Sequence, residues 1–146
     1  MTKMTIDRDT FTIRFQRTLA ASRDDVFDAW TQPAQLAQWW DPTGARLAKC
    51  TVDLRVSGAF CFENEGHSPP FQGVYRVIER PAKLVFEALG AIGTVTLESS
   101  GGTTSMQVTI RCASADHLAQ FVKLGADVNT GRTLDNLGAL VENQAA

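Results

Sequence analysis

Apolar and polar residues alternate along residues 11–19, near the start of the chain. Phe11, Ile13 and Phe15 occupy every second position, and polar residues stand between them. A period of two is typical of a strand that buries one face. This segment therefore predicts a strand with its aromatic residues turned inward.

The period changes to that of a helix immediately afterwards. Ser22, followed three residues later by an aspartate, resembles a capping box, so we expect a helix to begin here. Pro33 suits the first turn of a second short helix. On that helix Leu36, Trp39 and Trp40 form an apolar face at positions i, i+3 and i+4.

From residue 51 to residue 112 the pattern returns to short strands separated by turns. Consecutive short strands with tight connections favour an antiparallel meander. With the first strand, they make a sheet of about seven strands. The expected strands are 51–56, 59–64, 73–79, 83–89, 93–99 and 103–112. The bulky residues expected on the inner face are Phe11, Phe15, Phe60, Phe62, Tyr75, Phe86 and Met106.

The last third of the chain has a helical period again. Ser114 is a suitable N-cap for a helix over 115–123, and Gly125 breaks that helix. A longer helix then runs to about Glu142, with Leu134 on its apolar face. This order predicts an α+β fold: a curved antiparallel sheet wrapped around a long C-terminal helix, with two short helices after the first strand.

Composition and charge narrow the class of protein. The 146 residues favour one domain over residues 1–146. A net charge of −2 without any basic run argues against a nucleic-acid partner. The N-terminus lacks the apolar region of a signal peptide, and no apolar run reaches the ~20 residues of a membrane span. We therefore expect a cytoplasmic protein without membrane insertion.

The spacing of the cysteines and histidines does not indicate a metal site or a catalytic nucleophile. The three cysteines are odd in number and widely spaced, which fits neither a disulfide framework nor a metal knuckle. The two histidines lie fifty residues apart. Asp53 and Arg55 are expected to form a surface ion pair, and Asp135 to cap or pair locally. We expect no catalytic residue, no metal and no cofactor.

All three tryptophans fall between Asp28 and Trp40. Trp30 is expected to pack between its helix and the sheet. Adjacent helical residues point about 100° apart, so Trp39 and Trp40 cannot be equally buried under one face. We expect one of the two to anchor the helix in the core and the other to lie at the rim of a cavity.

The segment TLAASRDDVFDAWTQPAQLAQWWDPTG, residues 18–44, resembles the opening signature of homologues of the heat-shock-protein ATPase activator. These belong to the START-like, or SRPBCC, helix-grip superfamily. The segments VDLRVSGAFCF, GVYRVIERPAKLVF and TLDNLGALV resemble later motifs of the same family. The resemblance covers an ordered core at about 11–142. Ser57 departs from it, because the family usually has glycine there. Asn129 and Thr130 stand near the place of a Gly-Trp pair that the last helix of relatives often carries.

The resemblance implies a hydrophobic cavity between the sheet and the long helix, used in relatives for small apolar or amphipathic molecules. We therefore expect binding of a small hydrophobic or lipid-like molecule, with His67 as a polar contact in a loop. Two alternatives stay open: an enzyme acting on an aromatic or polyketide-like substrate, and a protein that stimulates a chaperone ATPase. The chain has no room for the additional N-terminal domain of the eukaryotic activator, so we expect no chaperone partner, although a homodimer is compatible with each reading. The expected ligand-binding residues are Trp39, Trp40, Phe62, His67, Tyr75, Phe86, Met106 and Leu134.

Overall fold

The structure, a computed structural model, describes residues 2–64 and 70–145. Its strands form one antiparallel sheet in the order β1-β2-β8-β7-β6-β5-β4-β3. The strands are β1 (Lys3–Asp7), β2 (Thr12–Leu19), β3 (Lys49–Val52), β4 (Ala59–Glu63), β5 (Phe71–Glu79), β6 (Lys83–Ala88), β7 (Ala91–Ser100) and β8 (Thr103–Arg111). The helices are α1 (Arg23–Thr31), α2 (Pro33–Trp39), α3 (Ala115–Lys123) and α4 (Ala126–Ala145).

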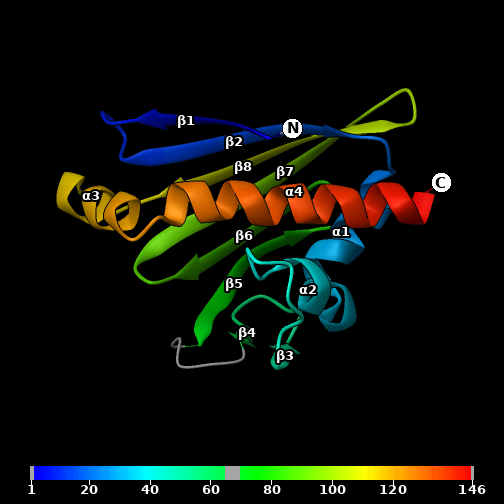
Figure 1. Cartoon of the computed structure of the whole chain (residues 1–146), viewed down its shortest axis with the longest axis horizontal. Coiled ribbons are helices and arrows are strands. Elements are labelled where there is room, and N and C mark those ends of the chain that lie inside the picture. The colour runs from blue at the N-terminus through cyan, green and yellow to red at the C-terminus, as the bar shows by residue number, and fades with distance from the viewer. Residues whose placement is uncertain (1, 65–69, 146) are drawn as a thin grey trace.

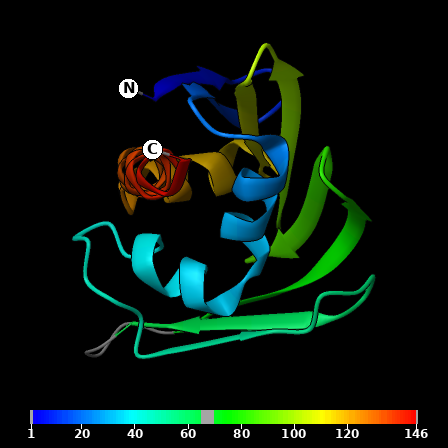
Figure 2. The same cartoon turned by 90° about the vertical axis from the view of Figure 1, so that its right-hand side faces the viewer.

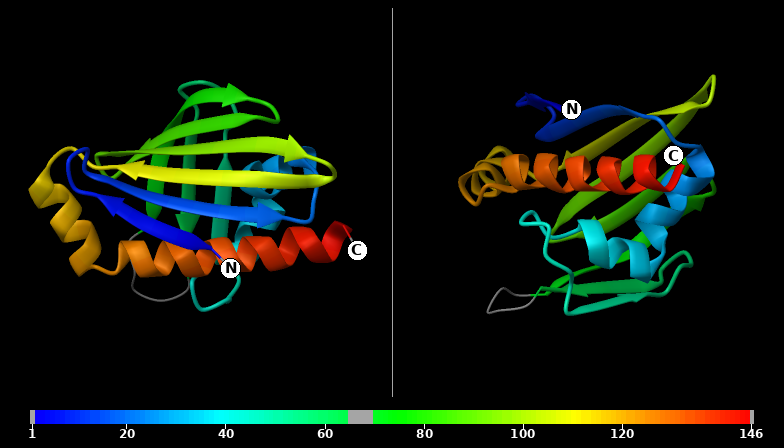
Figure 3. Two further views of the ribbon diagram at one scale, coloured as in Figure 1. Left: turned by 90° about the horizontal axis from the view of Figure 1, so that it is seen from above. Right: turned by 45° about the vertical axis from the view of Figure 1, so that its right-hand side comes forward.

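The sheet bends around α4, which lies along its concave face (Figures 1 and 2). Helices α1 and α2 lie between α4 and the β3–β4 end of the sheet, where α2 contacts both β3 and α4. Figure 3 shows α3 set at an angle to α4, at the end of the molecule opposite the C-terminus. This arrangement confirms the α+β helix-grip fold expected from the sequence.

Helix boundaries follow from their capping residues. The Ser22 hydroxyl accepts a hydrogen bond from the Asp25 N–H at 3.2 Å, and Pro33 occupies the start of α2. The Ser114 hydroxyl accepts from the His117 N–H at 3.1 Å, which places the start of α3 at the predicted residue. Each cap satisfies a backbone N–H that the first turn of a helix leaves without a partner.

The long helix α4 is held to the sheet by an apolar face and by a pair of ionic contacts. Leu134, Leu137 and Val141 are fully buried against the sheet. The Arg17 side chain on β2 reaches Asp135 at 2.6 Å and Glu142 at 3.6 Å. The prediction that Asp135 pairs locally was therefore wrong, because its partner lies on a strand more than a hundred residues away.

Within the described residues the sheet has eight strands, whereas the sequence predicted about seven. Strand β1 was not predicted, because the apolar side chains of KMTID are few and mostly exposed. It forms because β2 offers it an edge: Met4 pairs with Phe15, and Ile6 pairs with Ile13. Backbone pairing with a neighbouring strand, rather than burial of a face, defines this element.

The expected strand over 51–56 ends at Val52. Leu54 and Val56 were predicted to alternate inward, but they lie in a loop and are 41% and 62% exposed. The loop forms because Gly58 N–H donates to the Arg55 carbonyl at 2.8 Å, while Ser57 adopts a φ of 68°. The ion pair between Asp53 and Arg55 is present at 2.8 Å on this exposed loop.

Candidate functional site

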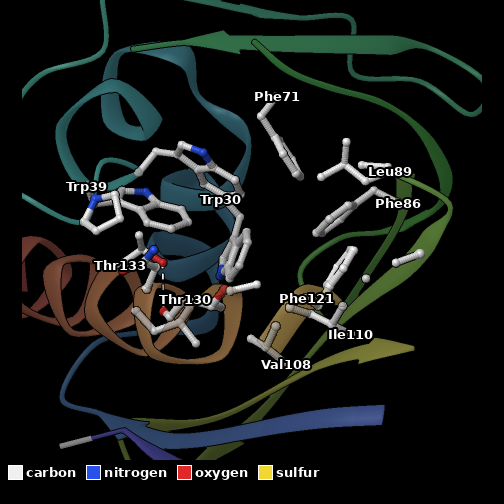
Figure 4. A pocket seen from close by; sticks show the side chains of 18 of the residues that line it. Trp30, Trp39, Phe71, Phe86, Leu89, Val108, Ile110, Phe121, Thr130 and Thr133 are labelled. Atoms are coloured by element: carbon white, nitrogen blue, oxygen red, sulfur yellow. Dashed lines mark hydrogen bonds between the residues drawn. The ribbon is translucent and has the colours of Figure 1, made fainter. Parts of the chain in front are cut away.

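A cavity of about 270 Å³ lies between the sheet and the N-terminal half of α4. Side chains from α1, α2, the strands, α3 and α4 surround it (Figure 4). Its lining residues are Trp30, Trp39, Trp40, Pro42, Asn64, Phe71, Phe86, Ala88, Leu89, Ala91, Gly93, Val108, Ile110, Phe121, Ala126, Asn129, Thr130, Thr133 and Leu134. The described part of the chain therefore leaves the hollow of the sheet open rather than filled by its own side chains.

The three tryptophans form one wall of the cavity. Trp39 is the anchor: its ring is buried, and its indole N–H donates to the Ala29 carbonyl at 2.8 Å. Trp30 packs edge-on against it, with ring centroids 4.9 Å apart. Trp40 is only partly buried, and its ring lies 5.0 Å from that of Phe71. Trp39 is therefore the buried member of the adjacent pair and Trp40 the partly buried one, and both line the cavity.

The opposite wall depends on a close contact between β6 and β7. Phe86 pairs across the sheet with Gly93. A Cβ at Gly93 would lie 2.5 Å from the Phe86 ring, which is shorter than side-chain packing allows. Because position 93 is glycine, the ring can lie against the sheet, and space remains between it and the helices.

The polar part of the lining is neutral and lies mainly on α4. Thr130 and Thr133 face the cavity from this helix. Asn129 of the same helix and Asn64, which follows β4, also line it. The Thr133 hydroxyl donates to the Thr130 carbonyl at 2.8 Å. Among the described residues that line the cavity, none is Asp, Glu, Lys, Arg or His.

One carboxylate fixes the loop beside the cavity without lining it. The Asn64 side-chain N–H donates to an Asp41 carboxylate oxygen at 2.6 Å, and the Asn136 side chain donates to the Asp41 carbonyl at 3.1 Å. A hydrogen bond from the Thr43 hydroxyl is the main cause of the lowered pKa of Asp41. Asp41 therefore ties the connection after α2 to both β4 and α4.

At the other end, His117 joins α3 to the β6–β7 turn. Its Nδ1 accepts from the Ala113 N–H at 2.9 Å, so Nε2 carries the proton and donates to the Leu89 carbonyl at 3.0 Å. The His117 ring also packs edge-on against Phe121, a lining residue, at 4.7 Å. Leu89 is 64% exposed and lines the cavity, which places its mouth at this turn.

The structure brings together half of the residues proposed from the sequence as a binding site. Trp39, Trp40, Phe86 and Leu134 line the cavity. Three others do not: Phe62 and Tyr75 line an adjoining void of about 10 Å³, and Met106 is buried in the core. Space of that size holds at most one water molecule. The eighth residue, His67, lies outside the described residues.

Sequence reasoning missed several residues at the cavity. Val108 and Ile110 share the inward parity of Met106 on β8, but only they lie beside the N-terminal half of α4. The alternation of apolar and polar residues predicts which face of the sheet a side chain lies on. It does not predict which part of α4 covers that side chain. Thr130, Thr133 and Leu134 are spaced at i, i+3 and i+4, which predicts from the sequence that they share one face of the helix.

The described residues around the cavity offer little for acid–base or nucleophilic chemistry. On β3, burial raises the pKa of the Cys50 thiol to about 11, so it is protonated at neutral pH. No cluster of His, Cys, Asp or Glu that could hold a metal ion occurs within residues 2–64 and 70–145. The same part of the chain has no helix with the length and apolarity required to span a membrane.

A curved sheet gripping a long helix around a cavity defines an SRPBCC-like, helix-grip domain. The chain belongs to the family described as Activator of Hsp90 ATPase homolog 1-like protein, whose model matches residues 20–142. This match confirms the resemblance found in the sequence motifs.

Solved structures share the fold over nearly the whole chain. A protein from Nitrosomonas europaea is 20% identical, with a TM-score of 0.84 over 95% of this chain and 98% of its own. One from Arthrobacter aurescens is 19% identical, with a TM-score of 0.85 over 97% and 91%. One from Chromobacterium violaceum is 27% identical, with a TM-score of 0.69 over 90% and 97%. No curated protein matches the sequence significantly.

Proposed function

We propose that the protein binds a small apolar or amphipathic molecule in the cavity between the sheet and α4. The observation that carries this proposal is the cavity of about 270 Å³ with its aromatic and aliphatic walls. A preformed concave site with a few polar groups is the usual form of a small-molecule site. Moving apolar surface from water into such a site is favourable by roughly 25 cal/mol per Å².

The tryptophans provide a direct readout of this binding. All three line the cavity, and the chain has no others. We expect native mass spectrometry of the purified protein to detect a small molecule that is lost on denaturation. Adding that molecule back to the stripped protein should change the tryptophan emission in a saturable way.

A variant that fills the cavity tests whether binding occurs there. Thr130→Trp places an indole in the space beside α4, so binding should weaken by at least about 10-fold. Ala139→Trp is the matched control, because Ala139 is an exposed position of the same helix. If Thr130→Trp binds as tightly as the unchanged protein, the cavity is not the site.

Catalysis and chaperone stimulation are less well supported. An enzyme acting on an aromatic or polyketide-like substrate would need ionisable groups in the cavity, and the described lining has none. The family's name refers to activation of an Hsp90 ATPase, an activity that needs an exposed interaction surface rather than a cavity. An ATPase assay with added chaperone tests that function independently of the ligand.

We also propose a single domain that acts in the cytoplasm. One continuous sheet and one cluster of buried residues support the single domain. All three cysteines are free thiols, as is usual in a reducing compartment. Cell fractionation tests the location.

A further inference from the structure

We infer that the ligand is a neutral molecule with one ring or two fused rings. Its single polar group contacts Thr130 and Thr133 on α4. This inference rests on the proposed binding function and adds the size, charge and orientation of the ligand. It follows from the volume of the cavity, the absence of charge in its described lining, and the hydrogen-bonding state of two hydroxyl groups.

The volume sets the size of the ligand. An engineered apolar cavity of about 150 Å³ in another protein holds one benzene molecule. At the same packing, the cavity of about 270 Å³ here holds a molecule of about 11 non-hydrogen atoms. A bicyclic molecule has this size, whereas a long acyl chain or a polycyclic lipid exceeds it.

The walls favour a ring system. Trp30 and Trp39 face the cavity from the helices, and Phe71, Phe86 and Phe121 face it from the other side (Figure 4). Aromatic side chains interact favourably with the faces and edges of other rings, beyond the gain from burial alone. A ring between the two groups contacts aromatic side chains on both of its sides.

The described lining favours a neutral ligand. A buried charge is costly unless an opposite charge or several hydrogen bonds compensate for it. The described lining supplies neither an acidic nor a basic side chain. The Asp41 carboxylate beside the cavity already accepts hydrogen bonds from Thr43 and Asn64.

Two hydroxyl groups fix the orientation of the ligand. The Thr133 hydroxyl donates its hydrogen bond to the Thr130 carbonyl, so toward the cavity this hydroxyl can only accept one. The Thr130 side chain is half-buried, and its hydroxyl has no hydrogen bond to any described residue. A ligand hydroxyl can therefore donate to Thr133 and accept from Thr130. The structure thus points to a phenol-like group at the α4 side of the cavity.

Equilibrium dialysis with four probes tests the size and charge. We expect 2-naphthol to bind about 25-fold more tightly than naphthalene, because it adds two hydrogen bonds, each worth about 5-fold. The anion 2-naphthoate should bind at least about 100-fold more weakly than 2-naphthol. The four-ring probe 1-hydroxypyrene should bind at least about 10-fold more weakly, because it overfills the cavity.

Thr130→Val tests the polar contact, since valine keeps the shape and removes the hydroxyl. It should weaken 2-naphthol binding about 5-fold and leave naphthalene binding unchanged. Thr18→Val is the matched control, because Thr18 is exposed on β2 and lies outside the cavity. An equal loss for both probes would overturn the orienting role of Thr130.

The outcomes separate the inference from the function on which it rests. If 2-naphthoate or 1-hydroxypyrene binds as tightly as 2-naphthol, the inferred ligand class is wrong while binding in the cavity stands. If none of the four probes binds, and native mass spectrometry detects no small molecule, the binding function itself fails.

Discussion

Gly93 and Phe86 lie face to face across the β6–β7 pair, so close that any side chain at position 93 would collide with the ring. Because Gly93 on β7 has no Cβ, the Phe86 ring on the neighbouring strand β6 can lie flat against the sheet. This contact lies at the wall of the cavity, and the space available to a ligand depends on it.

Gly93→Ala should push the Phe86 ring into the cavity. We expect a loss of about 1–3 kcal/mol in the free energy of unfolding, from overpacking, and about 10-fold weaker binding of 2-naphthol. Denaturant unfolding and equilibrium dialysis measure the two effects. Val95→Ala on the same strand is the control: Val95 is buried but lies outside the cavity lining. That variant should lose about 2 kcal/mol of stability and bind normally.

Two glycines of α4 should respond to alanine in opposite directions. A Cβ at Gly138 would lie 2.6 Å from the Arg17 guanidinium, whereas a Cβ at Gly131 would meet nothing within 4 Å. Gly131→Ala should stabilise the protein by about 0.5–1 kcal/mol, because alanine is the better helix former. Gly138→Ala should destabilise it by about 1–3 kcal/mol, since Arg17 must move away from Asp135. Thermal unfolding measures both, and stabilisation by Gly138→Ala would contradict the close packing of Arg17.

Ser57→Gly should stabilise the loop between β3 and β4. Ser57 has a φ of 68°, in the left-handed region where residues with a Cβ are strained by roughly 1 kcal/mol. Its N–H donates to the Tyr75 carbonyl at 2.8 Å, a contact that glycine keeps. We expect a gain of about 1 kcal/mol in urea unfolding. Ser99→Gly, in the extended strand β7, should lose about 0.5–1 kcal/mol instead.

Asp135 should contribute to stability in a pH-dependent way. Burial opposes its ionisation, but hydrogen bonds from Thr2 and the charge of Arg17 outweigh burial, so its pKa in the folded state lies below 3.8. The unfolded chain therefore binds a proton more readily, and the contribution is present above pH 3.8 and lost as the pH falls further.

Removing this carboxylate should flatten the acid limb of the stability curve. The melting temperature of Asp135→Asn should lie below that of the unchanged protein at pH 6, and the gap should narrow toward pH 3. Asp53→Asn removes only an exposed ion pair, so its curve should follow the unchanged protein. A constant gap for Asp135→Asn would contradict the pH-dependent role.

The sequence predicted the fold well where local chemistry decides the structure. Ser22, Pro33 and Ser114 mark helix starts through caps and a fixed φ, which need no distant partner. The prediction was poorer where a remote contact decides. Strand β1 depends on the edge of β2, and the turn after β3 is tied to β5 by a hydrogen bond from the Ser57 N–H to the Tyr75 carbonyl.

The same distinction explains the outcome at the cavity. Alternation placed Phe62, Tyr75 and Met106 on the inner face, where the structure also has them buried. Whether such a buried residue lines the cavity depends on which part of the sheet α4 covers, and that position is decided by contacts between distant residues. The different burial of Trp39 and Trp40 was predictable, because Trp39 ends α2 and Trp40 follows it in helical conformation, so the two side chains point about 100° apart.

The close contact between Gly138 and the Arg17 guanidinium fixes the position of α4 along the sheet. If α4 shifted by one residue, the side chain of Leu137 or Ala139 would take the place of Gly138 and displace the Arg17 guanidinium from Asp135. Thr130 stands eight residues away, about 12 Å along the axis. The position of Thr130 and Thr133 along the sheet therefore depends on the contact between Gly138 and Arg17. Substitutions at that contact should change ligand binding although neither residue touches the ligand.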